Sequence, residues 1–235
     1  MKRRLTGGSS RDQWMLSRGA RDNCHVRVRT SESGRVVNGG PGERLEGEYA
    51  NIQSLKPNVT RQQALTMLEP QGLLRGVREA FLPPLRSLAD VYLPLYLFQV
   101  EIENRGVLQT SILGIDAVAG AMDPYHFEKI PADAETMEVR TRNRLRPVLP
   151  VGTAKQMLEG KVQRFLYQQG FFRLRDARTV LRAIPAELHV PYWLGFYGAK
   201  ERARLAVIDA VRRTREGAKA RGIFESWLKQ ERAVE

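Results

Sequence analysis

Apolar side chains follow two periods along this chain, and each period predicts one kind of element. Between residues 60 and 81 they recur at the 3.6-residue spacing of a helix. Thr60 and Gln63 form the Thr-x-x-Gln pattern of a capping box at the start of this segment, and Pro70 and Gly72 interrupt it. The pattern therefore predicts a helix that is broken or kinked near its middle.

The next stretch has the period of β-strands. Val91–Leu97 is apolar throughout, which is typical of a strand covered on both faces, whereas residues 98–103 alternate and keep one wet face. A turn signal at residues 104–106 makes Val107–Asp116 the expected return strand of a hairpin. Because a proline cannot donate to a ladder, Pro94 is expected at an edge, a bulge or the start of its strand.

A shorter relative of this pattern returns in the second half of the chain. Another Thr-x-x-Gln at Thr153 predicts the start of a helix, and Leu188–Gly195 repeats the apolar and aromatic run. The sequence Ile-Asp-Ala-Val closes both runs, with Asp116 in the first and Asp209 in the second. Thr60 and Thr153 are 93 residues apart, and so are the two aspartates. The shared landmarks predict an internal duplication.

Together these segments predict an α+β fold of two tandem units, each a helix plus an antiparallel β-hairpin, which share one sheet. The first unit with its connection is expected at 59–149 and the second at 150–235. An amphipathic C-terminal helix is expected at 216–231, and its apolar face carries Ala220, Ile223, Phe224, Trp227 and Leu228. Either the protein's own sheet or a second subunit is expected to cover this face.

Two other segments are poor in large apolar side chains. Residues 1–58 hold Gly, Ser, Arg and Asn clusters and are predicted to be a disordered or weakly ordered basic tail, with one short hairpin at His25–Val37. The prolines between residues 121 and 150 predict a connection, with one strand at Glu138–Leu145.

Composition and charge narrow the classes of partner. The chain of 235 residues has a net charge of +12, and the basic excess lies in residues 1–58 and in residues 150–235, while residues 59–149 are near neutral. Such asymmetry favours an anionic partner, although the Arg-rich composition of a GC-rich genome would look the same. A single cysteine, Cys24, no secretory signal and no apolar run long enough to span a bilayer predict a cytoplasmic protein without membrane insertion.

The first unit carries a family resemblance. A helix opening on Thr-x-x-Gln-Ala-Leu, an alternating hairpin and a close on Ile-Asp-Ala-Val-x-Gly resemble the PepSY-type helix-plus-hairpin module over most of residues 59–123. The matching residues are Thr60, Gln63, Ala64, Leu65, Phe98, Val100, Ile102, Ile115, Asp116, Ala117, Val118 and Gly120. The chain departs from the family at Ala119, where the family has Thr, and the second unit lacks the Gly. The resemblance implies a non-catalytic binding or regulatory module, and no functional residue carries over.

Three side chains are candidates for chemistry. Asp116 and Asp209 could face each other as an acid/base pair if a pseudo-twofold axis relates the units, or each could accept backbone N–H groups in a turn. His189 could pair with Asp209 as a base with its orienting group, or be a core histidine. The histidines lack metal-site spacing, and no phosphate-binding loop is present, so neither a metal nor a cofactor is expected.

A second candidate site combines aromatic rings with cations in the second unit. Rings that stack on bases beside cations that contact phosphates are typical of single-strand binding, unless the rings face the core and the cations form a solvated rim. The residues are Tyr192, Trp193, Lys200, Arg202, Arg204, Arg212, Arg213 and Arg215.

The sequence therefore favours a non-enzymatic cytoplasmic binding or scaffold protein that acts through protein contacts or self-association. Its partner is an unknown protein or a second copy, and Ile223, Phe224 and Trp227 are the predicted contact residues. One alternative is a nucleic-acid-binding protein that uses the basic second half. Another is a hydrolase that uses Asp116, Asp209 or His189.

Overall fold

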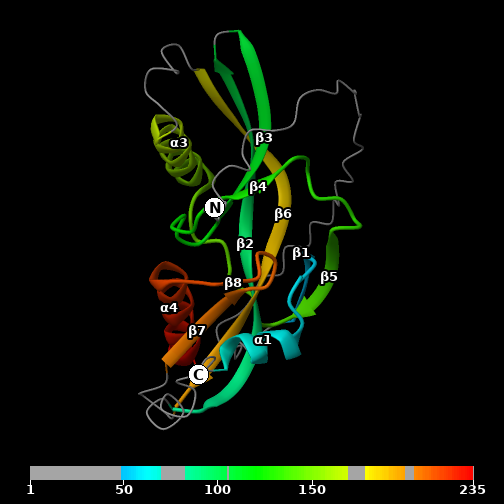
Figure 1. The fold of residues 1–235 in the computed structure, drawn as a ribbon, viewed down its shortest axis with the longest axis vertical. Coiled ribbons are helices and arrows are strands. Elements are labelled where there is room, and N and C mark those ends of the chain that lie inside the picture. The colour runs from blue at the N-terminus through cyan, green and yellow to red at the C-terminus, as the bar shows by residue number, and fades with distance from the viewer. Residues whose placement is uncertain (1–48, 70–82, 105, 169–177, 199–203, 235) are drawn as a thin grey trace, which may run out of the picture. The chain divides into compact units, whose positions relative to one another are not determined.

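The computed structural model describes residues 49–69, 83–104, 106–168, 178–198 and 204–234 (Figure 1). All of them belong to one compact unit, Arg44–Glu235. They form three helices and a strand-rich sheet, so the predicted α+β class is confirmed. In chain order the elements are β1 (Ala50–Leu55), α1 (Arg61–Leu68), β2 (Leu85–Asn104), β3 (Val107–Asp116), β4 (Tyr125–Phe127), β5 (Thr136–Thr141), α3 (Val151–Gln168), β6 (Arg178–Tyr197), β7 (Arg204–Asp209), β8 (Thr214–Arg215) and α4 (Ala218–Val234).

Two long antiparallel strands form the middle of the sheet. Among the described residues the strand order is β4-β3-β2-β6-β1-β5, and β7 pairs with β6 and with β8. β2 and β6 have 20 residues each and lie side by side from the pair Leu85–Tyr197 to the pair Glu103–Arg178. The apolar run Val91–Leu97 of β2 is buried at every position except Tyr96, as expected for a strand covered on both faces. The predicted β2–β3 hairpin is also confirmed.

The pairing of β2 with β6 is symmetric about its middle. Tyr92 lies opposite Pro191, and Pro94 lies opposite His189, so the midpoint falls at Leu93. Pro94 follows Leu93 in β2, and Pro191 follows Val190 in β6. Because the strands are antiparallel, the two prolines lie at equal distances on either side of the pair Leu93–Val190.

Both prolines lie where a central strand changes partners. The N–H of Tyr92 donates to the carbonyl of Asn143, whereas pairing with β3 begins at Leu95, so the missing N–H of Pro94 falls between the two partners. A register shift after Leu95 marks a bulge at the same place, as expected for this proline. Pro191 occupies the corresponding position in β6, between the segments paired with β1 and with β7.

The two helices that precede the long strands cover different parts of the sheet. Apolar residues of α1 pack with β7 and the end of β6, in a cluster of Val59, Ala64, Leu68, Ile208 and Ala210. Apolar residues of α3 pack with the β2–β3 hairpin, in a cluster of Phe98, Val100, Leu113, Ile115, Ala154, Leu158, Val162 and Leu181. Because β2 and β6 run the length of the sheet, α1 lies over the hairpin that contains β7, and α3 lies over the hairpin that contains β3.

Of the two capping boxes predicted from the sequence, the one at Thr60 is present and the one at Thr153 is not. Thr60 caps α1, and the reciprocal hydrogen bonds between Thr60 and Gln63 confirm the predicted capping box. The prediction that Thr153 caps the second helix is wrong. Helix α3 begins at Val151, three residues before the first helical residue that a cap at Thr153 would give, and the carbonyl of Pro150 accepts the N–H of Ala154. A proline fits this position because the first helical turn leaves N–H groups without a partner inside the helix.

The predicted tail and connection also differ from the structure in places. Residues 50–55, assigned above to the weakly ordered tail, form β1 and pair with β5. The strand expected at Glu138–Leu145 is β5 and begins two residues earlier. The hairpin expected at His25–Val37 and the helix expected beyond Pro70 lie outside the described residues.

Helix α4 packs on the protein's own sheet. Ala220, Ile223 and Phe224 are buried, and the ring centroid of Phe224 lies 5.1 Å from that of Tyr192 in β6. Of the two partners expected for this apolar face, the structure places the protein's own sheet against it. None of the described helices is both long and apolar enough to cross a membrane.

The turns that leave β3 and β7 both contain a residue in the left-handed region, four positions after the closing aspartate. In the first turn this residue is Gly120, with φ of 62°, and in the second it is Arg213, with φ of 60°. A Cβ atom on Gly120 would lie 2.7 Å from the sulfur of Met157, whereas Arg213 is exposed. The first turn therefore requires glycine, and the second accepts a side chain at the cost of backbone strain.

We expect the two positions to respond to substitution in opposite directions. Gly120→Ala should lower the free energy of unfolding by about 1–3 kcal/mol, because it adds left-handed strain and a contact with Met157. Arg213→Gly should raise it by roughly 0.5–1 kcal/mol, because strain is removed where no packing is lost. Urea denaturation of both variants and the wild type measures these changes. A loss of stability in Arg213→Gly would contradict the assignment of strain.

Candidate functional site

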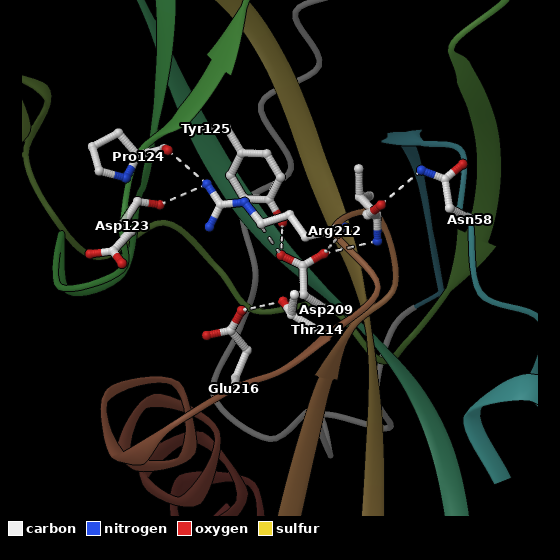
Figure 2. A network of polar contacts seen from close by, with 9 residues as sticks. Asn58, Asp123, Pro124, Tyr125, Asp209, Arg212, Thr214 and Glu216 are labelled. Carbon is white, nitrogen blue, oxygen red and sulfur yellow. Dashed lines mark hydrogen bonds and ion pairs between the residues drawn. The ribbon is translucent and has the colours of Figure 1, made fainter. Parts of the chain in front are cut away.

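The most connected polar group in the described residues surrounds Asp209, at the end of β7 (Figure 2). Its side chain is fully buried, and Oδ1 accepts the N–H groups of Val211 and Arg212, each at 2.8 Å. Oδ2 accepts a short hydrogen bond from the hydroxyl of Tyr125, which comes from β4. The turn after β7 is thereby joined to a strand more than 80 residues earlier in the sequence.

Arg212 also joins the turn after β7 to the segment around β4. Its Nη2 donates to the carbonyl oxygens of Asp123, at 3.1 Å, and Pro124, at 2.7 Å (Figure 2). The guanidinium lies 3.8 Å from the centroid of the Tyr125 ring, and Nε is 3.9 Å from Oδ2 of Asp209. Cation–π and ion-pair contacts thus act together on one side chain. Arg212 holds the segment that enters β4 against the turn that leaves β7.

Asp116, at the end of β3, has a simpler environment. Its Oδ1 accepts the N–H groups of Ala119 and Gly120 at 2.7 and 2.8 Å, and its Oδ2 accepts that of Met122 at 2.9 Å. Both aspartates therefore bind backbone N–H groups as their chains leave the sheet, which confirms the turn interpretation. Within the described contacts each carboxylate accepts N–H groups of the turn that follows it, and no contact joins Asp116 to Asp209.

His189 lies in the middle of β6 and not beside Asp209. It is fully buried between Pro94 of β2 and Ser54 of β1, and the Ser54 hydroxyl donates to its carbonyl oxygen at 3.3 Å. Neither ring nitrogen makes a hydrogen bond of normal geometry, although the backbone of Gln53 is close enough to favour the protonated ring. Burial is the larger effect and lowers the pKa of His189. The core interpretation of this histidine is the one that the geometry supports.

Burial changes the proton affinity of several groups around Asp209. Burial, with Tyr192 and Asp209 nearby, raises the pKa of Tyr125 far above its usual value, and burial likewise raises the pKa of Tyr192. Burial and then the neighbouring Asp209 raise the pKa of Glu216. The Tyr192 hydroxyl is buried beside that of Tyr125 without a hydrogen bond of normal geometry. Both phenols therefore stay protonated at neutral pH.

Sequence reasoning gave no role to Tyr125, Glu216 or Lys161. Nζ of Lys161, in α3, donates to the carbonyl of Met122 at 2.6 Å and so holds the turn after β3. Burial lowers the pKa of this amine. Shifted groups often mark functional sites, but structural networks shift them too. No spacing in the sequence identifies these residues, because their partners lie in distant segments.

The predicted aromatic and basic patch is divided between core and surface. Tyr192 is buried, and Trp193 is half-buried with Nε1 donating to the carbonyl of Val59 at 2.9 Å. Arg212 is engaged with β4 as described above. The exposed cations are Arg204, Arg213 and Arg215, and Lys200 and Arg202 lie outside the described residues. This arrangement matches the interpretation in which the rings face the core and the cations form a rim.

The predicted partner-binding residues lie on the inner side of α4. Ile223 and Phe224 are buried in the core, and Trp227 is half-buried against it. Within the described residues no three His, Cys, Asp or Glu side chains come together in a group that could hold a metal ion.

Comparison of the chain with protein-family models, with curated proteins and with solved structures found no match.

The hydroxyl of Tyr125 should contribute to stability through the buried carboxylate. Tyr125→Phe leaves Asp209 without one donor, and we expect the free energy of unfolding to fall by about 1–3 kcal/mol. Tyr49→Phe is the control, because Tyr49 is 58% exposed and its ring stays beside Arg140 after the change. Guanidinium denaturation measures both variants. Equal stability of the two variants would show that the hydrogen bond to Asp209 contributes nothing.

The buried imidazole should make stability depend on pH. The pKa of His189 in the folded chain lies below its ordinary value of 6.5, so the unfolded chain binds more protons between the two values. Stability should therefore fall as the pH drops below about 6.5, and His189→Leu should flatten this decline. Thermal unfolding between about pH 5 and 8 measures the slope. Ser54→Ala, which keeps the imidazole, should retain it, and an unchanged slope in His189→Leu would refute this origin.

Proposed function

We propose that this chain is a non-enzymatic binding or scaffold protein of the cytoplasm that acts through protein contacts, including contacts between its own copies. The observation that carries the proposal is that strand edges are open in the described residues, among them residues 107–111 of β3, beyond the end of β4, and the outer side of β5. Large apolar side chains are exposed on both, with Val107 and Leu108 on β3 and Met137 on β5. An open edge presents N–H and C=O groups to which another chain can add as a strand.

The arrangement of the polar side chains supports a binding role over a hydrolase. A catalytic acid or base must lie within hydrogen-bond reach of the proton that it transfers. The carboxylates of Asp116 and Asp209 instead accept hydrogen bonds from their own turns, and His189 is buried in β6 between β1 and β2. For these three groups to act as catalytic acids or bases, the contacts that hold them would have to break.

We also infer that the two halves arose by tandem duplication of one helix-plus-hairpin unit. Equal spacing of the two turn aspartates and the symmetric register of β2 and β6 support this origin. The N–H of Ala117 donates to Pro94 and that of Ala210 to Pro191, which is the same contact in each half. The resemblance of the first unit to PepSY modules, which implies binding or regulation, is consistent with the proposed role.

Nucleic-acid binding is the second candidate. The net charge of +12 and the exposed side chains of Arg204, Arg213 and Arg215 around β7 and β8 favour it. Phosphate contacts from such a group would need no aromatic stacking, because backbone neutralisation alone gives sequence-independent binding. The buried position of Tyr192 removes one of the two rings on which stacking was expected, and the other, Trp193, is half-buried with its Nε1 bonded to Val59.

Site-specific photo-crosslinking tests the proposed function. A photoreactive amino acid at Leu108 or at Met137 should capture a protein in an extract of the cells that naturally make this chain. The same amino acid at Glu225, exposed on the outer side of α4, is the control. Protein capture no stronger at the edges than at Glu225 would overturn the proposal. If RNA then shifted in a gel and rising salt abolished the shift, nucleic-acid binding would replace it.

A further inference from the structure

The open edge of β3 is defined by where β4 stops. β4 pairs with β3 only at residues 112–114, so residues 107–111 have β2 on one side and no described strand on the other. The hairpin tip extends past β4 at this point (Figure 1). Within the described sheet, the outer side of these five residues is therefore an edge.

The register shows which backbone groups point outward. Asn104 pairs with Val107 across a two-residue loop, and in such a hairpin the closing pair exchanges both hydrogen bonds. Hydrogen bonding to β2 then alternates along the strand, so Leu108 and Thr110 direct their N–H and C=O groups away from β2. Ile112, which lies opposite Phe127 of β4, continues the same alternation. Among the described residues, the groups of β3 left without a strand partner on this side are therefore those of Leu108 and Thr110.

The side chains of this edge lack the usual protection against pairing. Natural edge strands carry charges, prolines or bulges that discourage a second strand. Residues 107–111 contain no charged residue, and Val107 and Leu108 are 60% and 62% exposed. The outer side of β5, at the end of the strand order, carries the exposed charges of Glu138 and Arg140. Of these two edges, residues 107–111 of β3 are better suited than β5 to accept a strand.

We propose that residues 107–111 pair antiparallel with the same residues of a second copy, forming a homodimer with a continuous sheet. The inference rests on the proposed function and names its partner. With Gln109 on the twofold axis, Leu108 of each copy lies opposite Thr110 of the other, so every free N–H and C=O gains a partner. A segment without charge suits this contact, because two chains of net charge +12 repel each other elsewhere.

The dimer is weak, because five residues of strand bury less surface than a stable interface needs. The test is sedimentation velocity of the full chain from about 1 μM to about 1 mM, a range suited to small interfaces. We expect a shift from monomer to dimer across this range. Thr110→Pro removes an outward N–H but none that binds β2, and it should weaken the dimer at least about tenfold. Met137→Lys, which adds a charge to the β5 edge, is the control and should dimerise as the wild type does.

A charge-pair experiment distinguishes specific loss of the dimer from misfolding of a variant. Leu108→Lys and Leu108→Glu should each stay monomeric, and their mixture should dimerise, because the two residues 108 are diagonal neighbours across the axis. Dimerisation unaffected by these changes and by Thr110→Pro would overturn the assignment to β3. A wild type that stays monomeric at all concentrations would overturn the homodimer. If Leu108 still captured another protein by crosslinking, the proposed function would survive that result; without capture both would fail.

Discussion

Every other part of the described sheet is attached to the pairing of β2 with β6. β3 extends from one side of this pair, β1 and β7 attach to the other side, and the helices α1 and α3 lie over its two ends. The central residues Leu93 and Val190 face each other and are almost completely buried. Since the two strands are separated by about a hundred residues of chain, their pairing carries a loop-closure cost, which the burial of apolar side chains along both strands helps to offset. We therefore expect a folding process governed by non-local contacts.

This dependence explains which elements the sequence could predict. The β2–β3 hairpin is local, and its alternation and turn signal identify it correctly between Phe98 and Asp116. The first half of β2 is different, because Leu85–Asp90 is mixed in polarity after two prolines and has no local pattern of a strand. It is a strand because β6 lies beside it. β1 was missed for the same reason, since it is held by β5 and by one pair with His189.

The contacts of the candidate site also fall into local ones, which the sequence could predict, and long-range ones, which it could not. That Asp116 and Asp209 accept N–H groups of their own turns could be predicted, because the contacts are two to six residues away along the chain. The hydrogen bond from Tyr125 to Asp209 could not, because it joins residues 84 positions apart that only the strand order brings together. Contacts between residues close in the sequence can be predicted from their spacing, whereas contacts between distant residues require knowledge of the strand order.

The two aspartate turns show how similar local structures can come to differ. In the first turn three backbone N–H groups satisfy Asp116, and Gly120 takes the left-handed position without strain. In the second, a phenol replaces one backbone donor, and Arg212 and Arg213 stand where the first turn has Ala119 and Gly120. A strained Arg213 adds no contact to the core, but Arg212 links β4 to β7. Compared with the first turn, the second has a strained backbone, and it also connects two strands that are distant in the sequence.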